Sequence, residues 1–209
     1  FGARSSVALV ALACIYPVGM KIAAGSHERD LGNAIGFLVG ALVLGTAFPH
    51  LLKALGQSYP WEAVTVTVSL TAAIGGILMW IFVPDGPYLV KGAKFDPRAL
   101  AAIFRSPLFR ASAFGYFGHM WELYAFWAFV PVVLAAHFGE AQSGLRVPLW
   151  AFWIIGAGSI GCVVGGLLSL RVGSARVAFA QLATSGTCCI ASPILFHAPT
   201  PVFLIFMLV

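Results

Sequence analysis

Glu122 and His119 are the two side chains best placed to bind a proton or a polar solute. Glu122 is the one acidic residue deep within a long apolar stretch, and His119 precedes it by three positions. On a helix this spacing places both side chains on one face, which Gly115, Phe126 and Phe129 extend. A carboxylate can bind and release a proton, and an imidazole changes charge near neutral pH. The pair could therefore bind a proton or a polar solute.

Two other roles for this pair stay open. His119 and Glu122 could form a structural contact that holds helices together through hydrogen bonds. They could also act as the acid and base of an integral-membrane enzyme, although the sequence has no motif for a nucleophile or a cofactor. A metal centre is not expected, because the pair supplies two ligands and no second histidine follows at helical spacing. No cofactor is predicted.

Three more residues are candidates for a solute or proton pathway. Lys21 lies near the end of an apolar stretch, where it could either serve the pathway or extend to the membrane interface. Tyr16 precedes it and is followed by Pro17, which would kink a helix and free a carbonyl group. Trp121 lies beside Glu122, where it could line a cavity or pack in the core.

The composition excludes a soluble enzyme. The 209 residues are 60% hydrophobic and 9% charged, against about 25% charged in soluble domains, and the mean hydropathy is +0.95. The net charge of +5 does not indicate nucleic acid binding, since the cations lie scattered between apolar runs. These values predict an integral membrane protein in a lipid bilayer.

The apolar residues fall into segments long enough for membrane helices. They do not alternate strictly with polar residues, as the strands of a membrane barrel would. The prediction is an all-α integral membrane fold, a polytopic helical bundle of seven spans with the last one truncated. The expected spans are 7–25, 31–53, 62–83, 109–137, 148–170, 177–196 and one from about 200.

The distribution of lysine and arginine predicts the orientation. Nine cations lie on one side of the alternating spans and three on the other, and the richer side faces the cytoplasm. The long connection 84–107 is then cytoplasmic, while Gln57 and Gln142 lie outside. Asp96 and Pro97 resemble a helix start, so this connection carries either a short amphipathic helix or a plain solvated linker.

Glycines concentrate in two of the expected spans. Membrane helices associate where small residues let their backbones approach, so 31–53 and 148–170 are expected to pack together, with Gly40 and Gly161 near the contact. The glycines assigned to this packing are Gly36, Gly40, Gly45, Gly158, Gly161 and Gly165.

Three stretches together resemble the major facilitator superfamily (MFS) of secondary transporters, in its bacterial members. The first runs from Tyr16 to Lys21 and continues with Gly36 to Gly40, Gly45 and Pro49 to Leu51; the second is Gly115 to Leu123. The third resembles the superfamily's short cytoplasmic loop motif and comprises Gly166, Leu168, Ser169, Arg171, Gly173 and Arg176. This resemblance implies that the chain corresponds to about helices four to ten of a twelve-helix transporter.

The resemblance also implies a division into two halves. Residues 1–83 would end the N-terminal half, 84–107 would be the cytoplasmic linker, and 108–209 would begin the C-terminal half. The loop motif would act in gating, although Leu170 stands where the family usually has an acidic residue. The chain begins without Met and ends within an apolar run, so we expect it to be part of a longer protein.

The sequence thus predicts secondary active transport of a small solute across the bacterial inner membrane. Transport would proceed by alternating access, as a symporter coupled to protons through Glu122 and His119, and the protein would work as a monomer. An integral-membrane enzyme and a membrane sensor without transport activity are the alternatives. No residue identifies the solute, and antiport and uniport stay open beside the expected symport.

Overall fold

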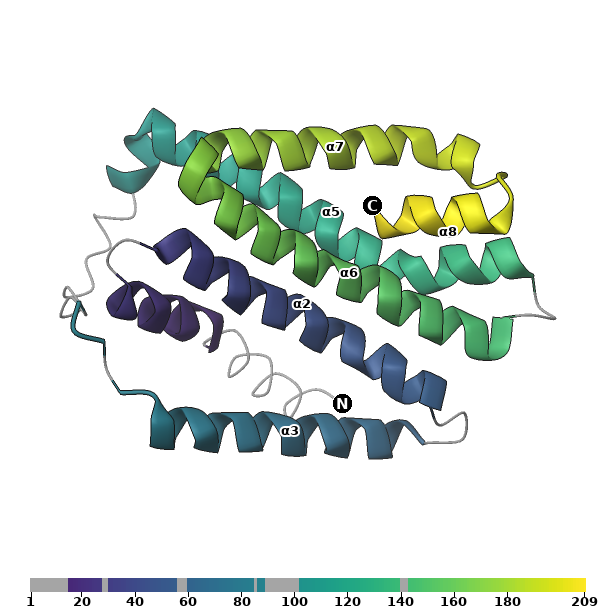
Figure 1. Cartoon of the computed structure of the whole chain (residues 1–209), viewed down its shortest axis with the longest axis horizontal. Coiled ribbons are helices and arrows are strands. Elements are labelled where there is room, and N and C mark those ends of the chain that lie inside the picture. Colours follow the sequence, from purple (N-terminus) through teal and green to yellow (C-terminus); the bar gives the residue numbers. More distant parts are fainter. Residues whose placement is uncertain (1–14, 28–29, 56–59, 85, 89–101, 140–142) are drawn as a thin grey trace.

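The computed structural model describes residues 15–27, 30–55, 60–84, 86–88, 102–139 and 143–209. All regular secondary structure in these residues is helical, and the long helices lie roughly side by side (Figure 1). Five helices, α2, α3, α5, α6 and α7, are long and apolar enough to cross a membrane. The predicted all-α, polytopic class is confirmed.

The helix bounds agree with the expected spans to within a few residues. Residues 15–26 are helical, while the start of the first expected span lies outside the described residues. The expected span from about 200 is the short helix α8. The other bounds are α2 Leu31–Leu55, α3 Trp61–Phe82, α5 Pro107–Phe138, α6 Ser143–Val172, α7 Ser174–Leu195 and α8 Thr200–Leu208.

Local signals in the sequence define the ends of α5. The hydroxyl of Ser106 accepts a hydrogen bond from the Phe109 backbone N–H at 3.4 Å, and Pro107 occupies the first turn, where its missing N–H costs nothing. Gly139 ends the helix with φ 72°, a conformation that suits glycine. The expected helix start at Asp96 and Pro97 lies outside the described residues.

Among the described helices, α2 and α6 share the most extensive contact, and their backbones meet at small residues. A Cβ atom added to Gly36 would lie 2.9 Å from the carbonyl oxygen of Cys162 and 3.1 Å from the Cα of Gly166. A Cβ added to Gly40 would lie 3.0 Å from the carbonyl oxygen of Ser159. Glycine at these two positions therefore permits the approach.

Three of the glycines assigned to this contact are not in it. Gly45 and Gly161 are exposed, and no described atom outside their own helix turn lies within 4 Å of an added Cβ. Gly45 lies five residues after Gly40 on α2, and Gly161 lies two residues after Ser159 on α6. On a helix these offsets rotate each glycine away from the other helix. Gly165 faces the Gln181 side chain of α7, 2.6 Å from an added Cβ. Gly158 does contact α2, at 3.3 Å from Val43.

Buried side chains form two small clusters. One joins α5, α6 and α8 and contains Val130, Leu134, Val147, Ala151, Ile154, Phe203 and Leu204. The other joins α2 and α6 through Val43, Ala47 and Ile155, with Trp127 of α5 packed against it.

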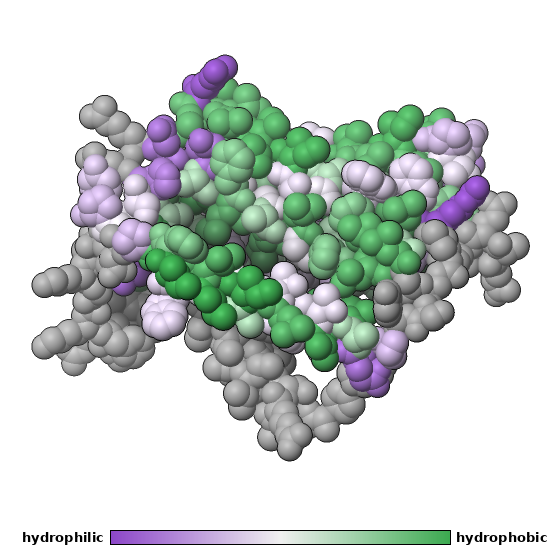
Figure 2. Space-filling view, turned by 60° about the horizontal axis from the view of Figure 1, so that its bottom comes forward, coloured by the Kyte–Doolittle hydropathy of each residue, from purple (hydrophilic) through white to green (hydrophobic). Residues whose placement is uncertain are grey.

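Most large apolar side chains lie on the outside of the bundle instead. Trp80 and Phe82 on α3, for example, are 87% and 71% exposed. Figure 2 shows apolar residues over the middle of one face and hydrophilic residues toward its edges. This distribution suits a helical bundle whose surroundings are hydrocarbon.

Candidate functional site

The Glu122 carboxylate lies halfway along α5. Glu122 is 15 residues after Pro107 and 16 before Phe138, so about 22 Å of helix separate it from either end. Its side chain is 28% exposed, and its Oε2 lies 3.9 Å from Nδ1 of His119, whose side chain is 46% exposed. The structure therefore brings the two predicted residues together on one face of α5.

Two side chains of α7 complete the surroundings of this carboxylate. The hydroxyl of Ser185 donates a hydrogen bond to Oε1 of Glu122. The Cys189 thiol lies 3.6 Å from the same oxygen and points its weak donor toward it. Ser185 and Cys189 are four residues apart and so share one face of α7. We call Glu122, His119, Ser185 and Cys189 the Glu122 cluster.

This arrangement suits a carboxylate that changes its protonation. The ionised carboxylate accepts hydrogen bonds from the hydroxyl and the thiol. The protonated form can donate to the hydroxyl oxygen of Ser185, because a hydroxyl both donates and accepts. The cluster can therefore satisfy either state without moving a helix, and the same contacts also hold α5 against α7.

Sequence reasoning missed both α7 partners. All the cysteines lie within apolar runs, a pattern that predicts small buried apolar residues, yet Cys189 is exposed and its thiol donates to Glu122. Cys162 and Cys188 are partly buried. The spacing of Ser185 and Cys189 indicates a shared polar face on this helix. The sequence alone does not indicate that this face meets α5.

The remaining pathway candidates lie apart from the Glu122 cluster. Tyr16 lies beside Tyr116 of α5, within range of a hydrogen bond between their side chains. Trp121 is 82% exposed, and as the neighbour of Glu122 it projects about 100° away around the helix. Lys21 is exposed on the helical segment 15–26. The polar partners of Glu122 among the described residues are those of the cluster alone.

The predicted gating motif forms the junction of α6 and α7. Gly173 is the single residue between the two helices, and its φ of 96° is one that side-chain-bearing residues rarely adopt. Its N–H donates to the Ser169 carbonyl at 3.0 Å, and its carbonyl accepts from Val177 at 3.2 Å. Arg171 and Arg176 are exposed on either side of the turn.

Two members of this motif face α2. A Cβ added to Gly166 would lie 2.7 Å from the carbonyl oxygen of Gly32, and one added to Gly32 would lie 2.7 Å from the hydroxyl of Ser169. That hydroxyl donates to the carbonyl of Gly166 at 2.7 Å. The structure thus adds Gly32 and Gly166 to the residues that pack α2 on α6.

The sequence model described as Major Facilitator Superfamily matches residues 2–209. No curated protein and no solved structure matches the chain.

Proposed function

The chain belongs to the Major Facilitator Superfamily, and on this premise we propose that it couples the transport of a small solute to protons across the bacterial inner membrane. Members of this family are membrane transporters, so transport itself follows from the family. We propose three further points: the transport is coupled to protons, the solute is small, and the membrane is the bacterial inner membrane.

The Glu122 cluster is the observation that carries the proposal. A carboxylate in the middle of a membrane helix is costly and so points to a function. Here it has an imidazole 3.9 Å away and a hydroxyl donor from a second helix. A proton bound by Glu122 would neutralise it on one side of the membrane, and its release on the other side would restore the charge.

The close α2–α6 contact suits a transporter of two halves. We assign residues 1–83 to one half, 84–107 to a cytoplasmic linker and 108–209 to the other half. Alternating access would then rock the halves around a central site, with Gly36 and Gly40 near the pivot. Arg171 and Arg176 would stabilise one state from the cytoplasmic side, and Tyr16, which meets Tyr116 across the halves, would lie on the solute path.

The decisive experiment replaces Glu122 with glutamine. The amide is neutral and resembles the protonated acid, so Glu122→Gln should abolish accumulation driven by a pH gradient while exchange of solute remains measurable. Uptake into proteoliposomes, with and without an imposed gradient, separates the two activities, and candidate solutes can be screened by exchange first.

Ser185→Ala serves as the matched control. It removes the hydroxyl that bonds to Glu122 but leaves the carboxylate, so gradient-driven uptake should persist. If Glu122→Gln accumulates solute as the parent does, the carboxylate does not couple transport. The cluster then acts only as a contact between α5 and α7.

A further inference from the structure

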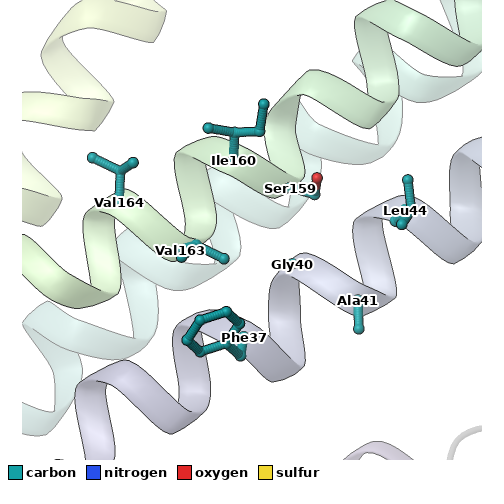
Figure 3. Close-up of a pocket in the computed structure, with 8 residues that line it drawn as sticks. All are labelled: Phe37, Gly40, Ala41, Leu44, Ser159, Ile160, Val163 and Val164. Carbon is teal, nitrogen blue, oxygen red and sulfur yellow. The ribbon is translucent and has the colours of Figure 1, made fainter.

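A surface groove of about 350 Å³ runs between α2 and α6 (Figure 3). We call it the α2–α6 groove. Gly40 is buried at its base, against the carbonyl oxygen of Ser159, while Phe37 and Ile160 at its rims are 58% and 67% exposed. Its lining residues are Phe37, Gly40, Ala41, Leu44, Ser159, Ile160, Val163 and Val164.

The chemistry of this groove is apolar. Ser159 is its single polar lining residue, and its hydroxyl already donates to the carbonyl of Gly156 at 2.7 Å. The groove therefore offers an occupant van der Waals contact and no free donor. A polar solute would lose its hydration there without compensation.

The groove opens away from the Glu122 cluster. The buried residues Val43 and Ile155 face Trp127 of α5, and α5 passes behind the α2–α6 pair in Figure 3. Ile160 lies 12 residues before the end of α6 at Val172, about 18 Å along the helix axis, within a hydrocarbon core about 30 Å thick. The groove therefore lies at the depth of the hydrocarbon core, on the side of the α2–α6 pair opposite α5.

A cation lies on α6 beyond one end of the groove. Ile160, Val164, Leu167 and Arg171 follow each other at intervals of four, three and four residues and so form one stripe along α6. Arg171 is exposed and lies seven residues beyond Val164, about 10 Å further toward the membrane surface. Its guanidinium can bind a phosphate with two parallel hydrogen bonds.

The charge around this end of α2 and α6 favours an anion. Arg176 adds a second cation just beyond the turn, whereas Asp30, directly before α2, adds one carboxylate. The groove begins about 10 Å from Arg171 along α6, so an acyl chain that descends toward the bilayer centre from a phosphate bound at Arg171 would reach it.

We propose that the α2–α6 groove binds an acyl chain of an anionic phospholipid whose phosphate pairs with Arg171. The apolar lining selects a hydrocarbon chain, and the cation on the same stripe selects the headgroup. Such a lipid would bridge α2 and α6 at their surface without entering the solute path.

Photo-crosslinking tests this proposal. The purified protein is placed in nanodiscs that contain phosphatidylglycerol or phosphatidylcholine with the same diazirine-labelled chain, and labelled peptides are mapped by mass spectrometry. Residues 37–44 and 159–164 should be labelled about five-fold more by phosphatidylglycerol, since one arginine near the surface contributes about that factor for an anionic lipid. Arg171→Gln should remove most of this difference, and Arg176→Gln should keep most of it.

A second pair of variants tests the groove itself. Ala41→Phe fills the groove and should abolish its labelling. Ala73→Phe makes the same change at an exposed position on α3 and should leave groove labelling intact. Thermal unfolding of each variant reports whether it is folded, and Val164→Phe on α6 fills the same groove if Ala41→Phe does not fold.

Three results would overturn the proposal. If both lipids label the groove equally and Arg171→Gln does not change this labelling, the groove contacts bulk lipid and has no specific lipid site. Groove labelling that survives both filling variants would place the chain elsewhere. Crosslinks between two copies of the protein at residues 37–44, with dimers in native mass spectra, would make a second copy the occupant.

Discussion

At the scale of single residues, hydrogen-bond capacity explains what the Glu122 cluster can do. The carboxylate lies where hydrocarbon surrounds the bundle, so each of its contacts weighs more than it would at a solvated surface. Ser185 donates to it, and a hydroxyl can reverse this bond when the carboxylate binds a proton. Cys189 contributes a weaker donor at 3.6 Å. The role of the cluster therefore depends on α7 as much as on α5.

Ser185→Ala should lower stability by about 0.6 kcal/mol, the average for hydrogen bonds between membrane helices, and by at most about 1.7 kcal/mol. The loss arises because the Glu122 side chain loses the donor that α7 supplies. Thermal unfolding of the purified protein in detergent measures it. Ser192→Ala on the same helix is the control, because the Ser192 hydroxyl donates to Cys189 of its own helix at 2.8 Å. A larger loss for Ser192→Ala would contradict the assignment.

Gly173→Ala should destabilise the α6–α7 junction by about 1 to 3 kcal/mol, the cost of holding a residue with a side chain in a sparsely populated positive-φ conformation. The cause is the φ of 96° at the one residue that separates the helices. Gly186→Ala is the matched control, since Gly186 lies within α7 and an added Cβ there meets no described atom within 4 Å. Equal melting temperatures for the two variants would mean that the junction relaxes freely.

At the scale of helices, close packing depends on which face a glycine occupies. The sequence places many glycines in α2 and α6, and this concentration indicates a contact. Composition cannot say which glycine points to the partner, because the relative rotation of the two helices is fixed by packing. Gly45 and Gly161 face outward, whereas Gly36 and Gly166 hold the backbones together.

Gly36→Leu should disrupt folding or transport more than Gly45→Leu, although both changes add the same side chain to α2. The side chain at Gly36 would meet backbone atoms of α6 that cannot move aside, such as the carbonyl of Cys162 at 2.9 Å. Yield of monodisperse protein and its melting temperature provide the comparison, with Gly161→Leu as the tolerated change on α6. Equal behaviour of the two α2 variants would mean that the helices separate without cost.

His137 of α5 adds polar and ring contacts to α8 and to the turn before it, beside the apolar cluster that joins the two helices. Nδ1 of His137 lies 2.9 Å from the carbonyl oxygen of Phe196, its Nε2 lies 3.2 Å from the Thr200 hydroxyl, and its ring stacks on Phe203 at 4.0 Å. His137→Ala should therefore loosen α8 and raise hydrogen exchange at residues 200–208. His197→Ala, at an exposed neighbour in the α7–α8 turn, should leave that exchange unchanged; a rise there as well would assign the effect to the turn.

At the scale of the whole molecule, hydropathy predicts the helices because each span must satisfy its backbone hydrogen bonds internally. The expected spans 31–53 and 109–137 match α2 and α5 within a few residues. The Glu122–His119 pair was predictable too, since both residues lie on one helix. Ser185 and Cys189 were not predictable, because contacts between helices depend on tertiary packing that residue spacing within one helix does not encode.

The orientation of the bundle yields the last prediction. Helix α7 crosses from Ser174 to Leu195, and the lysine and arginine count places its start, with the 84–107 connection, in the cytoplasm. In a background with every cysteine replaced and Cys189→Ser keeping a donor for Glu122, His197→Cys should react with an impermeant thiol reagent in intact cells. Ser174→Cys should react only after the membrane is opened. Because both positions are exposed, a difference in labelling reports the side of the membrane, and labelling of Ser174→Cys alone in intact cells would reverse the topology.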